Sequence, residues 1–268
     1  MRYIIRPIVS NILLFIESLL LILITLTFSL KITLLNQNSV LKQLKKTDYY
    51  EKVNDEIIDT MKYITRKTGY KDYIVEDIYS KEDIKNDINK FVNSLYKNNE
   101  LNLNTEHLKE NLENNLEKYL EEKGKEPTGK EKEYIKKIES TYKNEVLLMD
   151  QMKENSKTIS SYNKTISCLM PIFIIDFIVL LIINKMIFNK KEYHVIALTS
   201  AISLTAINIF TKTLNFKNLF IYNDNVSQVI KKLINNAQFV IIIFIILYII
   251  LGTILFIKSN KEKKEIYE

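Results

Sequence analysis

The stretch that decides the fold runs from Lys130 to Asn184 and ends in the apolar run ISCLMPIFIIDFIVLLII, residues 166–183. This run is long enough to cross the hydrocarbon core of a bilayer as a helix. The chain before it is charged and has neither Gly nor Pro until Pro171, which predicts one helix that passes from water into the membrane. Apolar side chains repeat along that helix at close to seven-residue spacing: Ile135, Ile138, Tyr142, Met149, Met152, Ile159 and Ile166.

Three further apolar segments, residues 7–30, 193–211 and 239–257, extend this pattern to four membrane spans. The first follows Arg2 and Arg6, but it is longer than the apolar core of a signal peptide and lacks a small-residue cleavage site, so we expect an uncleaved span. The third is short and carries several hydroxyl residues, which leaves a re-entrant or interfacial segment as the alternative. A true crossing places the lysines after residue 257 on the basic, cytoplasmic side. Both termini are then cytoplasmic.

The distribution of charge supports a membrane protein. The chain of 268 residues has 38 basic and 32 acidic residues. Residues 35–164 hold 24 of the basic and 25 of the acidic ones, so the remaining 14 basic and 7 acidic residues lie within or beside the apolar segments. A basic excess beside apolar spans is typical of membrane topology, whereas a nucleic-acid surface would place it on the soluble part.

Between the first two spans, residues 35–164 predict an extracytoplasmic domain built from helices alone. Its expected helices cover residues 40–64, 81–95, 105–120 and the helix that begins at Lys130, each with one apolar face. Gly69 is expected to end the first of these, and three turn formers within residues 124–129 separate the last two. Such helices bury their apolar faces by packing into a bundle.

The domain prediction follows from these segments. Residues 1–34 form the first span and a short cytoplasmic N-terminus, and residues 165–257 form three spans with an outer loop at 212–238. Within that loop, apolar residues from Val226 to Ile234 form a helical face, which either lies in the membrane interface or extends the last span outward; we favour the extension. Residues 258–268 are expected to be a short disordered cytoplasmic tail.

The motifs of catalysis and metal binding are missing from this sequence. It has no phosphate-binding glycine loop, no His-Glu-x-x-His and no nucleophile elbow. Its two histidines, His107 and His194, fall in separate compartments of the predicted topology, and its one cysteine, Cys168, lies in an apolar run. We therefore expect no enzyme, no cofactor and no metal site.

Two acids inside the predicted spans, Glu17 and Asp176, are the strongest candidate functional residues. An unpaired carboxylate near mid-bilayer costs several kcal/mol, so such residues face a bundle interior, a water-filled path or a partner. Because the first two spans are antiparallel, we expect the two acids to approach each other. The polar side of the third span completes the candidate network with Ser203, Thr205 and Asn208.

Two short stretches carry a family resemblance. VLKQL at residues 40–44 with YYEK at 49–52, and SKEDIKNDI at 80–88, together with the opening span, resemble uncharacterised membrane proteins of low-GC Gram-positive bacteria. In those proteins one span leads to a helical extracytoplasmic domain and then to three more spans. The resemblance implies a multi-pass plasma-membrane protein of such a bacterium, and it implies no activity.

Two functional hypotheses remain. The first is a non-enzymatic binding, sensing or assembly component that acts through its extracytoplasmic domain, with a membrane-protein partner or a second copy and no nucleic acid. The second is an ion or proton pathway, as a transporter or channel subunit, in which Glu17 and Asp176 carry the charge. The absence of an internal repeat and the small number of spans weigh against the second hypothesis.

Overall fold

The structure is a computed structural model that describes residues 2–97, 103–147, 151–188, 192–214 and 224–267. All regular secondary structure in these ranges is helical, which confirms the prediction of an all-α chain. Four of the helices contain segments long and apolar enough to cross a membrane: residues Ile8–Ile32, Thr158–Met186, Tyr193–Thr213 and Asp224–Lys261. The chain is therefore a multi-pass membrane protein by length and composition of its helices.

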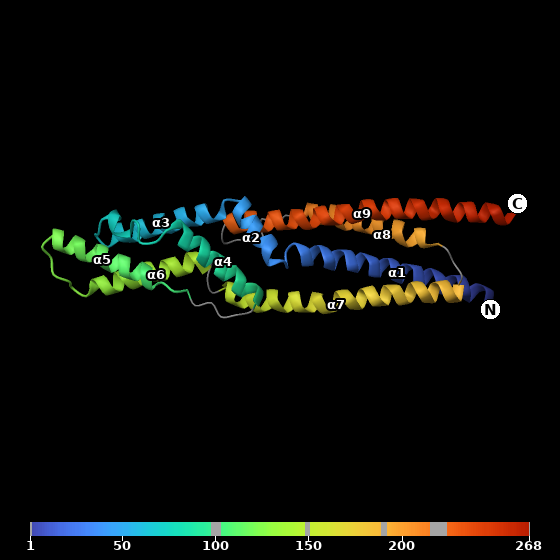
Figure 1. Cartoon of the computed structure of the whole chain (residues 1–268), viewed down its shortest axis with the longest axis horizontal. Helices are drawn as coiled ribbons and strands as arrows, with labels where there is room; N and C mark the ends of the chain where they lie inside the picture. The colour runs from blue at the N-terminus through green and yellow to red at the C-terminus, as the bar shows by residue number, and fades with distance from the viewer. Residues whose placement is uncertain (1, 98–102, 148–150, 189–191, 215–223, 268) are drawn as a thin grey trace. The chain divides into compact units, whose positions relative to one another are not determined.

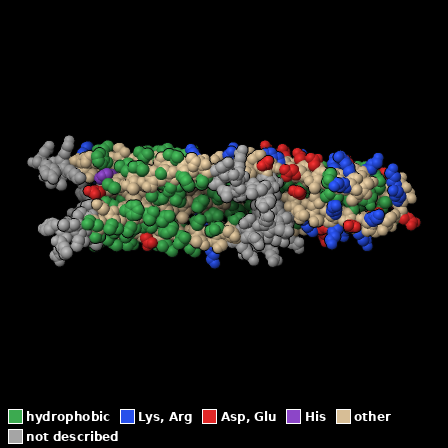
Figure 2. Space-filling view, turned by 180° about the vertical axis from the view of Figure 1, so that it is seen from behind, with side chains coloured by type: hydrophobic (Ala, Val, Ile, Leu, Met, Phe, Trp, Pro, Cys, Tyr) green, Lys and Arg blue, Asp and Glu red, His purple; other side chains and the backbone are tan. Residues whose placement is uncertain are grey.

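The chain folds as two compact units. One comprises residues 1–39, 162–222 and 230–268, and we call it the membrane unit because the apolar helices lie in it. The other comprises residues 40–161 and 223–229, and we call it the bundle unit. Figure 2 shows the contrast between them, since hydrophobic side chains cover the former and Lys, Arg, Asp and Glu cover the latter.

The bundle unit consists of short helices (Figure 1), which are amphipathic and pack around an apolar core. They are α2 (Gln37–Lys46), α3 (Tyr49–Lys67), the 3-10 helix η1 (Asp72–Val75), α4 (Lys81–Lys97), α5 (Glu106–Glu122) and α6 (Lys130–Leu147). Every helix except α2 sends at least one side chain into the centre, where the exposed fraction is at most 1% for Ile57, Met61, Ile74, Ile78, Ile84, Leu112, Ile138 and Val146. Burial of these side chains is the main force that holds the unit together.

Local sequence signals set the ends of these helices. Ser80 and Asp83 form a reciprocal capping box at the start of α4, because the Asp83 amide donates to Ser80 Oγ at 3.1 Å while Ser80 N and Oγ donate to the Asp83 carboxylate at 2.8 and 2.7 Å. After α3, Gly69 takes a positive φ of 82°, as a residue that ends a helix does.

The prediction of one helix over residues 40–64 is wrong. Asp48 adopts a left-handed backbone with φ 52° and ψ 32°, and this separates α2 from α3. An L-residue enters that region at a cost, which Asp bears better than most residues. The apolar face nevertheless continues across the break, since Leu44 and Val53 are both buried.

The membrane unit contains α1 (Arg2–Ile32), most of α7 (Gln151–Phe188), α8 (Tyr193–Thr213) and most of α9 (Asp224–Tyr267). Figure 1 shows these four helices side by side. A small apolar core joins α1, α8 and α9 through Ile22, Ala201, Leu204, Ile241 and Ile245. In α7, by contrast, none of the most apolar window is buried.

Two predictions about α9 are decided by its length. The helix is continuous from Asp224 to Tyr267, so the face around Val226 extends the last span, as expected, and does not form a separate interfacial helix. Residues 212–238 are therefore not a loop throughout. The predicted disordered tail is wrong as well, because α9 continues through Lys258 to Tyr267; its Lys and Glu residues are good helix formers. The predicted continuity of the helix from Lys130 to Asn184 falls at residues 148–150, outside the described ranges.

Candidate functional site

The candidate site lies along the buried face of α1, which is mostly polar. The buried residues of this helix recur every three or four positions, as the inward face of a helix does. Only Leu14 and Ile22 among them are apolar, with exposed fractions of 6% and 9%. The others, exposed by at most 4%, are Ser10, Glu17, Ser18, Thr25 and Ser29, and Thr33, which directly follows the helix, is buried in the same way.

Glu17 is the one acid on this face, and its side chain is fully buried. Asn184 of α7, which is 1% exposed, donates its Nδ2–H to the Glu17 carboxylate, at 3.1 Å from Oε2 and 3.3 Å from Oε1. At the next residue of α1, Ser200 Oγ of α8 donates to the Ser18 carbonyl at 3.1 Å. Polar contacts to two different helices thus meet at one level of α1.

Nearer its C-terminus, α1 makes polar contacts with α9 and α7. The Thr25 and Tyr248 hydroxyls are 2.7 Å apart, and Ser29 Oγ donates to the carbonyl of Ala237 at 2.8 Å. Lys31 Nζ donates to Ser167 Oγ at 2.6 Å and to Asn163, both on α7. Interhelical hydrogen bonds of this kind hold helices together where the surrounding lipid is as apolar as the side chains.

Several buried polar atoms of the membrane unit find no hydrogen-bond partner among the described residues. They are Ser10 Oγ, Asn184 Oδ1, His194 Nδ1 and Asn208 Oδ1. Buried polar groups in proteins are almost always paired with protein or ordered water. Unpaired atoms on three helices therefore indicate positions where small polar species, such as water, can be held.

The structure separates the two predicted acids. Asp176 is exposed on α7, between Ile175 and Val179, whose exposed fractions are 59% and 45%. Its distance from Asn184 along the helix is about 12 Å, at 1.5 Å per residue. Glu17 is buried against Asn184, so the expected approach of Glu17 to Asp176 does not occur within this chain.

The polar residues predicted on the third span behave differently from one another. Asn208 is buried, at 6% exposure. Ser203 is half-buried, and Thr205 is exposed and donates to the carbonyl of Ala201 in its own helix at 2.8 Å. The network that forms instead uses Ser200, one turn before the predicted set.

Asn184 and Ser200 are the residues that the sequence prediction missed. Asn184 directly follows the apolar run, where an amide marks the end of a span as readily as a buried contact. A signal for the network was present in the first span, where Ser10, Glu17, Ser18, Thr25, Ser29 and Thr33 fall on one helical face.

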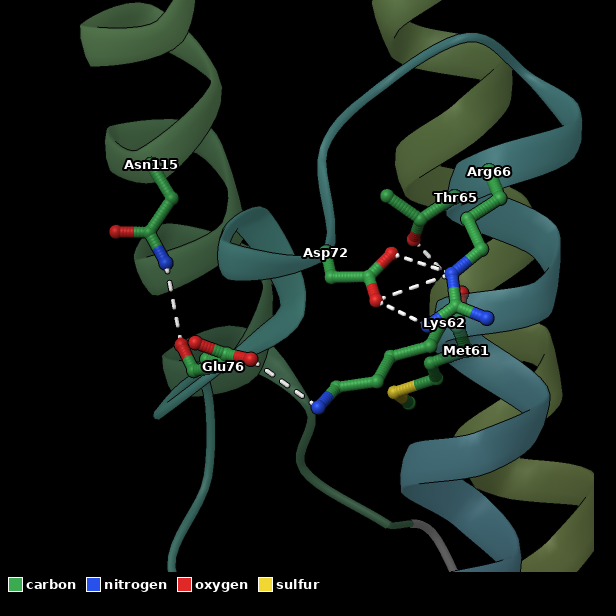
Figure 3. Close-up of polar contacts among 7 residues, drawn as sticks. All are labelled: Met61, Lys62, Thr65, Arg66, Asp72, Glu76 and Asn115. Carbon is green, nitrogen blue, oxygen red and sulfur yellow. Dashed lines mark hydrogen bonds and ion pairs between the residues drawn. The ribbon is translucent and has the colours of Figure 1, made fainter.

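The polar contacts of the bundle unit stabilise its surface (Figure 3). The Arg66 guanidinium pairs with both oxygens of Asp72, and Lys62 Nζ lies 3.1 Å from Glu76 Oε1. The hydrogen bonds from Arg66 lower the pKa of Asp72. Beside them, Asn115 Nδ2 donates to the Ile74 carbonyl at 3.1 Å, which fixes η1 against α5. The set connects helix ends, and its cations are already paired with acids.

A buried acid of the bundle unit bonds a tyrosine. The Tyr142 hydroxyl donates to Asp87 Oδ2 at 3.0 Å, and Lys90 Nζ lies 3.0 Å from Oδ1 of the same carboxylate. Elsewhere, burial and the nearby Glu56 raise the pKa of Glu145.

In the described part of the chain, no three His, Cys, Asp or Glu side chains are grouped as a metal site requires. Comparison of the chain with protein-family models, with curated proteins and with solved structures finds no match.

Proposed function

We propose that the chain is a non-enzymatic assembly component of the plasma membrane, which binds a partner membrane protein through the exposed face of α7 and presents the bundle unit outside the cytoplasm. The observation that carries this proposal is the exposure of Asp176 on an apolar helix that contributes little to the packing of its own unit. In keeping with the family resemblance, the host is a low-GC Gram-positive bacterium and both termini are cytoplasmic.

The exposed face of α7 consists of large apolar residues around one acid. Ile172, Ile175, Val179 and Ile182 are between 45% and 59% exposed, and Asp176 lies among them. A carboxylate on a lipid-facing surface at this depth is costly, by several kcal/mol if it remains charged and unpaired. A partner helix with a Lys or Arg at the same depth removes that cost, because it supplies the opposite charge in a dry interface.

The described spans do not supply that cation within their apolar runs. Lys31, Lys185, Lys212 and Lys258 lie at the edges of those runs, and Lys231 and Lys232 lie before the last one begins. A second copy of the chain would therefore bring another acid to Asp176. Charge complementarity favours a different membrane protein whose helix carries a basic residue near mid-bilayer.

The surface of the bundle unit supports a recognition role of polar character. Among its described residues, only Tyr63 and Tyr73 are exposed large hydrophobic side chains, at 56% and 39%. Scattered single aromatics are normal on soluble domains, whereas docking sites of apolar type are contiguous patches. A ligand of this unit is thus expected to bind through hydrogen bonds and charges.

The proposal is tested by native purification of the tagged full-length chain, with mass spectrometry of the proteins that co-purify. Wild type is compared with Asp176→Asn and with Cys168→Ser, a conservative change at an exposed position of the same helix. We expect a defined partner with a basic transmembrane residue, at least fivefold depleted in D176N and retained in C168S. A monomer without partner in all three samples, or a homo-oligomer unchanged by D176N, contradicts the proposal.

The proposed orientation has its own test. In a Cys168→Ser background, single cysteines replace Lys125, between α5 and α6, or Lys258, near the end of the last span. A membrane-impermeant maleimide added to intact cells should label the cysteine at 125 and leave the one at 258 unlabelled until the cells are permeabilised. The reverse pattern would place the bundle unit in the cytoplasm.

The pathway hypothesis keeps one supporting observation, the buried Glu17 beside unpaired polar atoms. It loses Asp176 as a second carrier on the same route, since that acid faces outward. The pathway hypothesis is rejected if the reconstituted protein produces no pH-dependent or ion-dependent flux in liposomes.

A further inference from the structure

Glu17 and Asn184 form a buried pair that fits either protonation state of the acid. In the structure the amide presents its Nδ2–H to both carboxylate oxygens, which suits the charged form. Its Oδ1 has no partner among the described residues. An amide carries a donor and an acceptor on opposite sides of one carbon, so a half-turn of the Asn184 side chain presents Oδ1 to a protonated Glu17 instead. A salt-bridge partner would not offer this choice.

Unpaired polar atoms continue from Glu17 toward one end of the unit. Helices α1 and α8 run parallel, since Ser18 meets Ser200 and, further along, Ile22 packs in one cluster with Leu204. Ser10 precedes Ser18 by about 12 Å along α1, and His194 precedes Ser200 by about 9 Å along α8, at 1.5 Å per residue. Ser10 Oγ and His194 Nδ1 thus lie at one level, toward the end where α1 begins, and both are unpaired within the described part.

We propose that Glu17 is a reversible proton-binding site inside the membrane unit, and that it exchanges its proton with water at the end of the unit where α1 begins, past Ser10 and His194. A hydronium ion delivers the proton to a Glu17 carboxylate oxygen, which becomes a carboxylic acid, and the same path returns it. Asn184 is the positioning residue that bonds the acid in both states. The inference is independent of the proposed partner, which binds the exposed face of α7 around Asp176.

The surroundings of Glu17 leave it as the principal titrating group of this site. The described neighbours on α7 are Asn184, which bonds it, and Lys185, which is exposed. At this end of α8 the ionisable groups are Glu192, Tyr193 and His194. On α9 they are Tyr248, which is bonded to Thr25 further along α1, and Lys258 and Lys261 at the end of the span. None of these forms an ion pair with Glu17 in the described contacts.

The test labels wild-type full-length protein in liposomes with dicyclohexylcarbodiimide, an apolar reagent that adds to protonated carboxyl groups. Labelling at pH 5.5 to 8.5 is measured by mass spectrometry of the peptides that contain Glu17 and Asp176. We expect reaction at Glu17 to decline as pH rises, by about tenfold per unit above the midpoint of titration. Labelling of Glu17 that is the same at every pH, or absent throughout while Asp176 reacts, overturns the proposal.

Three variants separate proton binding from a structural role. Asn184→Leu should move the pH at which Glu17 labelling is half-maximal, and Asn184→Gln should restore it, because Gln keeps the amide. His194→Gln should slow proton exchange at least threefold without moving that midpoint, measured as the rate at which the infrared band of the protonated Glu17 carboxyl changes after a rapid pH jump. If N184L leaves the midpoint unchanged, Asn184 only fills space and the two-state pairing is refuted.

Discussion

Two threonine–tyrosine hydrogen bonds of equal length allow the two units to be compared. Thr65 Oγ1 and Tyr134 OH are 2.7 Å apart in the bundle unit, and Thr25 Oγ1 and Tyr248 OH are 2.7 Å apart in the membrane unit. Each threonine is fully buried and also bonds a carbonyl one turn earlier in its own helix. The contact is the same, but the surroundings are opposite.

In the bundle unit the bond is a polar exception in an apolar core. Met61 and Ile138 are 0% exposed, and charged residues cover the surface. In the membrane unit the bond belongs to a polar inner face, while Phe15, Ile16 and Leu19 of the same helix are 65%, 39% and 45% exposed. The medium around a helix, water or lipid, thus decides which of its faces carries the apolar side chains.

The largest expected difference between the units concerns matched core leucines. Leu112 in the bundle unit and Leu204 in the membrane unit are both 0% exposed. We expect Leu112→Ala to cost about 3 kcal/mol, through lost transfer free energy and a cavity. Leu204→Ala should cost about half as much, because a displaced leucine in lipid stays in an apolar medium and only packing is lost.

The measurement is hydrogen exchange of the full-length protein in lipid nanodiscs, followed on peptides of α5 and α8 separately. Ile175, exposed on the lipid-facing side of α7, serves as the control. Ile175→Ala should change the stability measured on the α5 peptides and on the α8 peptides by no more than about 0.5 kcal/mol. If the two leucine variants lose the same stability, the free energy of transfer from water contributes equally in both units. That result would contradict the expected difference between them.

A smaller effect is expected for the two threonines. Thr65→Val should destabilise the bundle unit by about 1 kcal/mol, because it leaves the buried Tyr134 hydroxyl without its partner. Thr25→Val should cost about 0.6 kcal/mol, the average for an interhelical hydrogen bond in a membrane protein. The loss of stability in each variant is measured by hydrogen exchange, on α3 peptides for T65V and on α1 peptides for T25V. A larger loss for T25V than for T65V would reverse the expected order.

The smallest effect is a pH dependence confined to the bundle unit. Burial, with the charge of Glu56, raises the pKa of Glu145 above its ordinary 4.5. Above pH 4.5 the folded state therefore holds this proton more strongly than the unfolded state, and stability declines as pH rises through the window between the two pKa values. At neutral pH the folded protein bears the cost of a buried, charged Glu145 carboxylate, and Glu145→Gln removes that cost.

We expect E145Q to raise the melting temperature by about 1–3 °C at pH 7.5 and to match wild type near pH 4. The melting temperature is measured by near-ultraviolet circular dichroism, which follows the buried tyrosines of the bundle unit. Glu113→Gln, at a well-exposed position 44% open to solvent, is the control. A gain for E145Q that is equal at both pH values would exclude the pKa of Glu145 as its cause.

Strong, repeated signals in the sequence predicted most of the fold. The four spans follow from long apolar runs, which few other structures tolerate. The turn at residues 124–129 and the helix start at Ser80 follow from residue types with specific backbone roles. The break at Asp48 was missed because a single left-handed residue interrupts the helix without interrupting its apolar face.

The candidate site was less predictable, because it depends on which side of each span faces inward. Glu17 and Asp176 are equivalent in sequence, as single acids in apolar runs. Only the packing of α1 against α7 and α8 buries the former and leaves the latter exposed. Periodicity placed the polar residues of α1 on one face, but the identity of the partners Asn184 and Ser200 required the three-dimensional arrangement.

The polar inner face of α1 also constrains the order in which the protein can be built. Thr25 leaves the ribosome 223 residues before its partner Tyr248. At about 5–20 residues per second, that interval lasts roughly ten to forty-five seconds. Asn184, which bonds Glu17, follows it by 167 residues, so Glu17 also lacks its interhelical partner for most of that interval. Nascent α1 is therefore complete before α7, α8 and α9 can supply the interhelical bonds of its polar face.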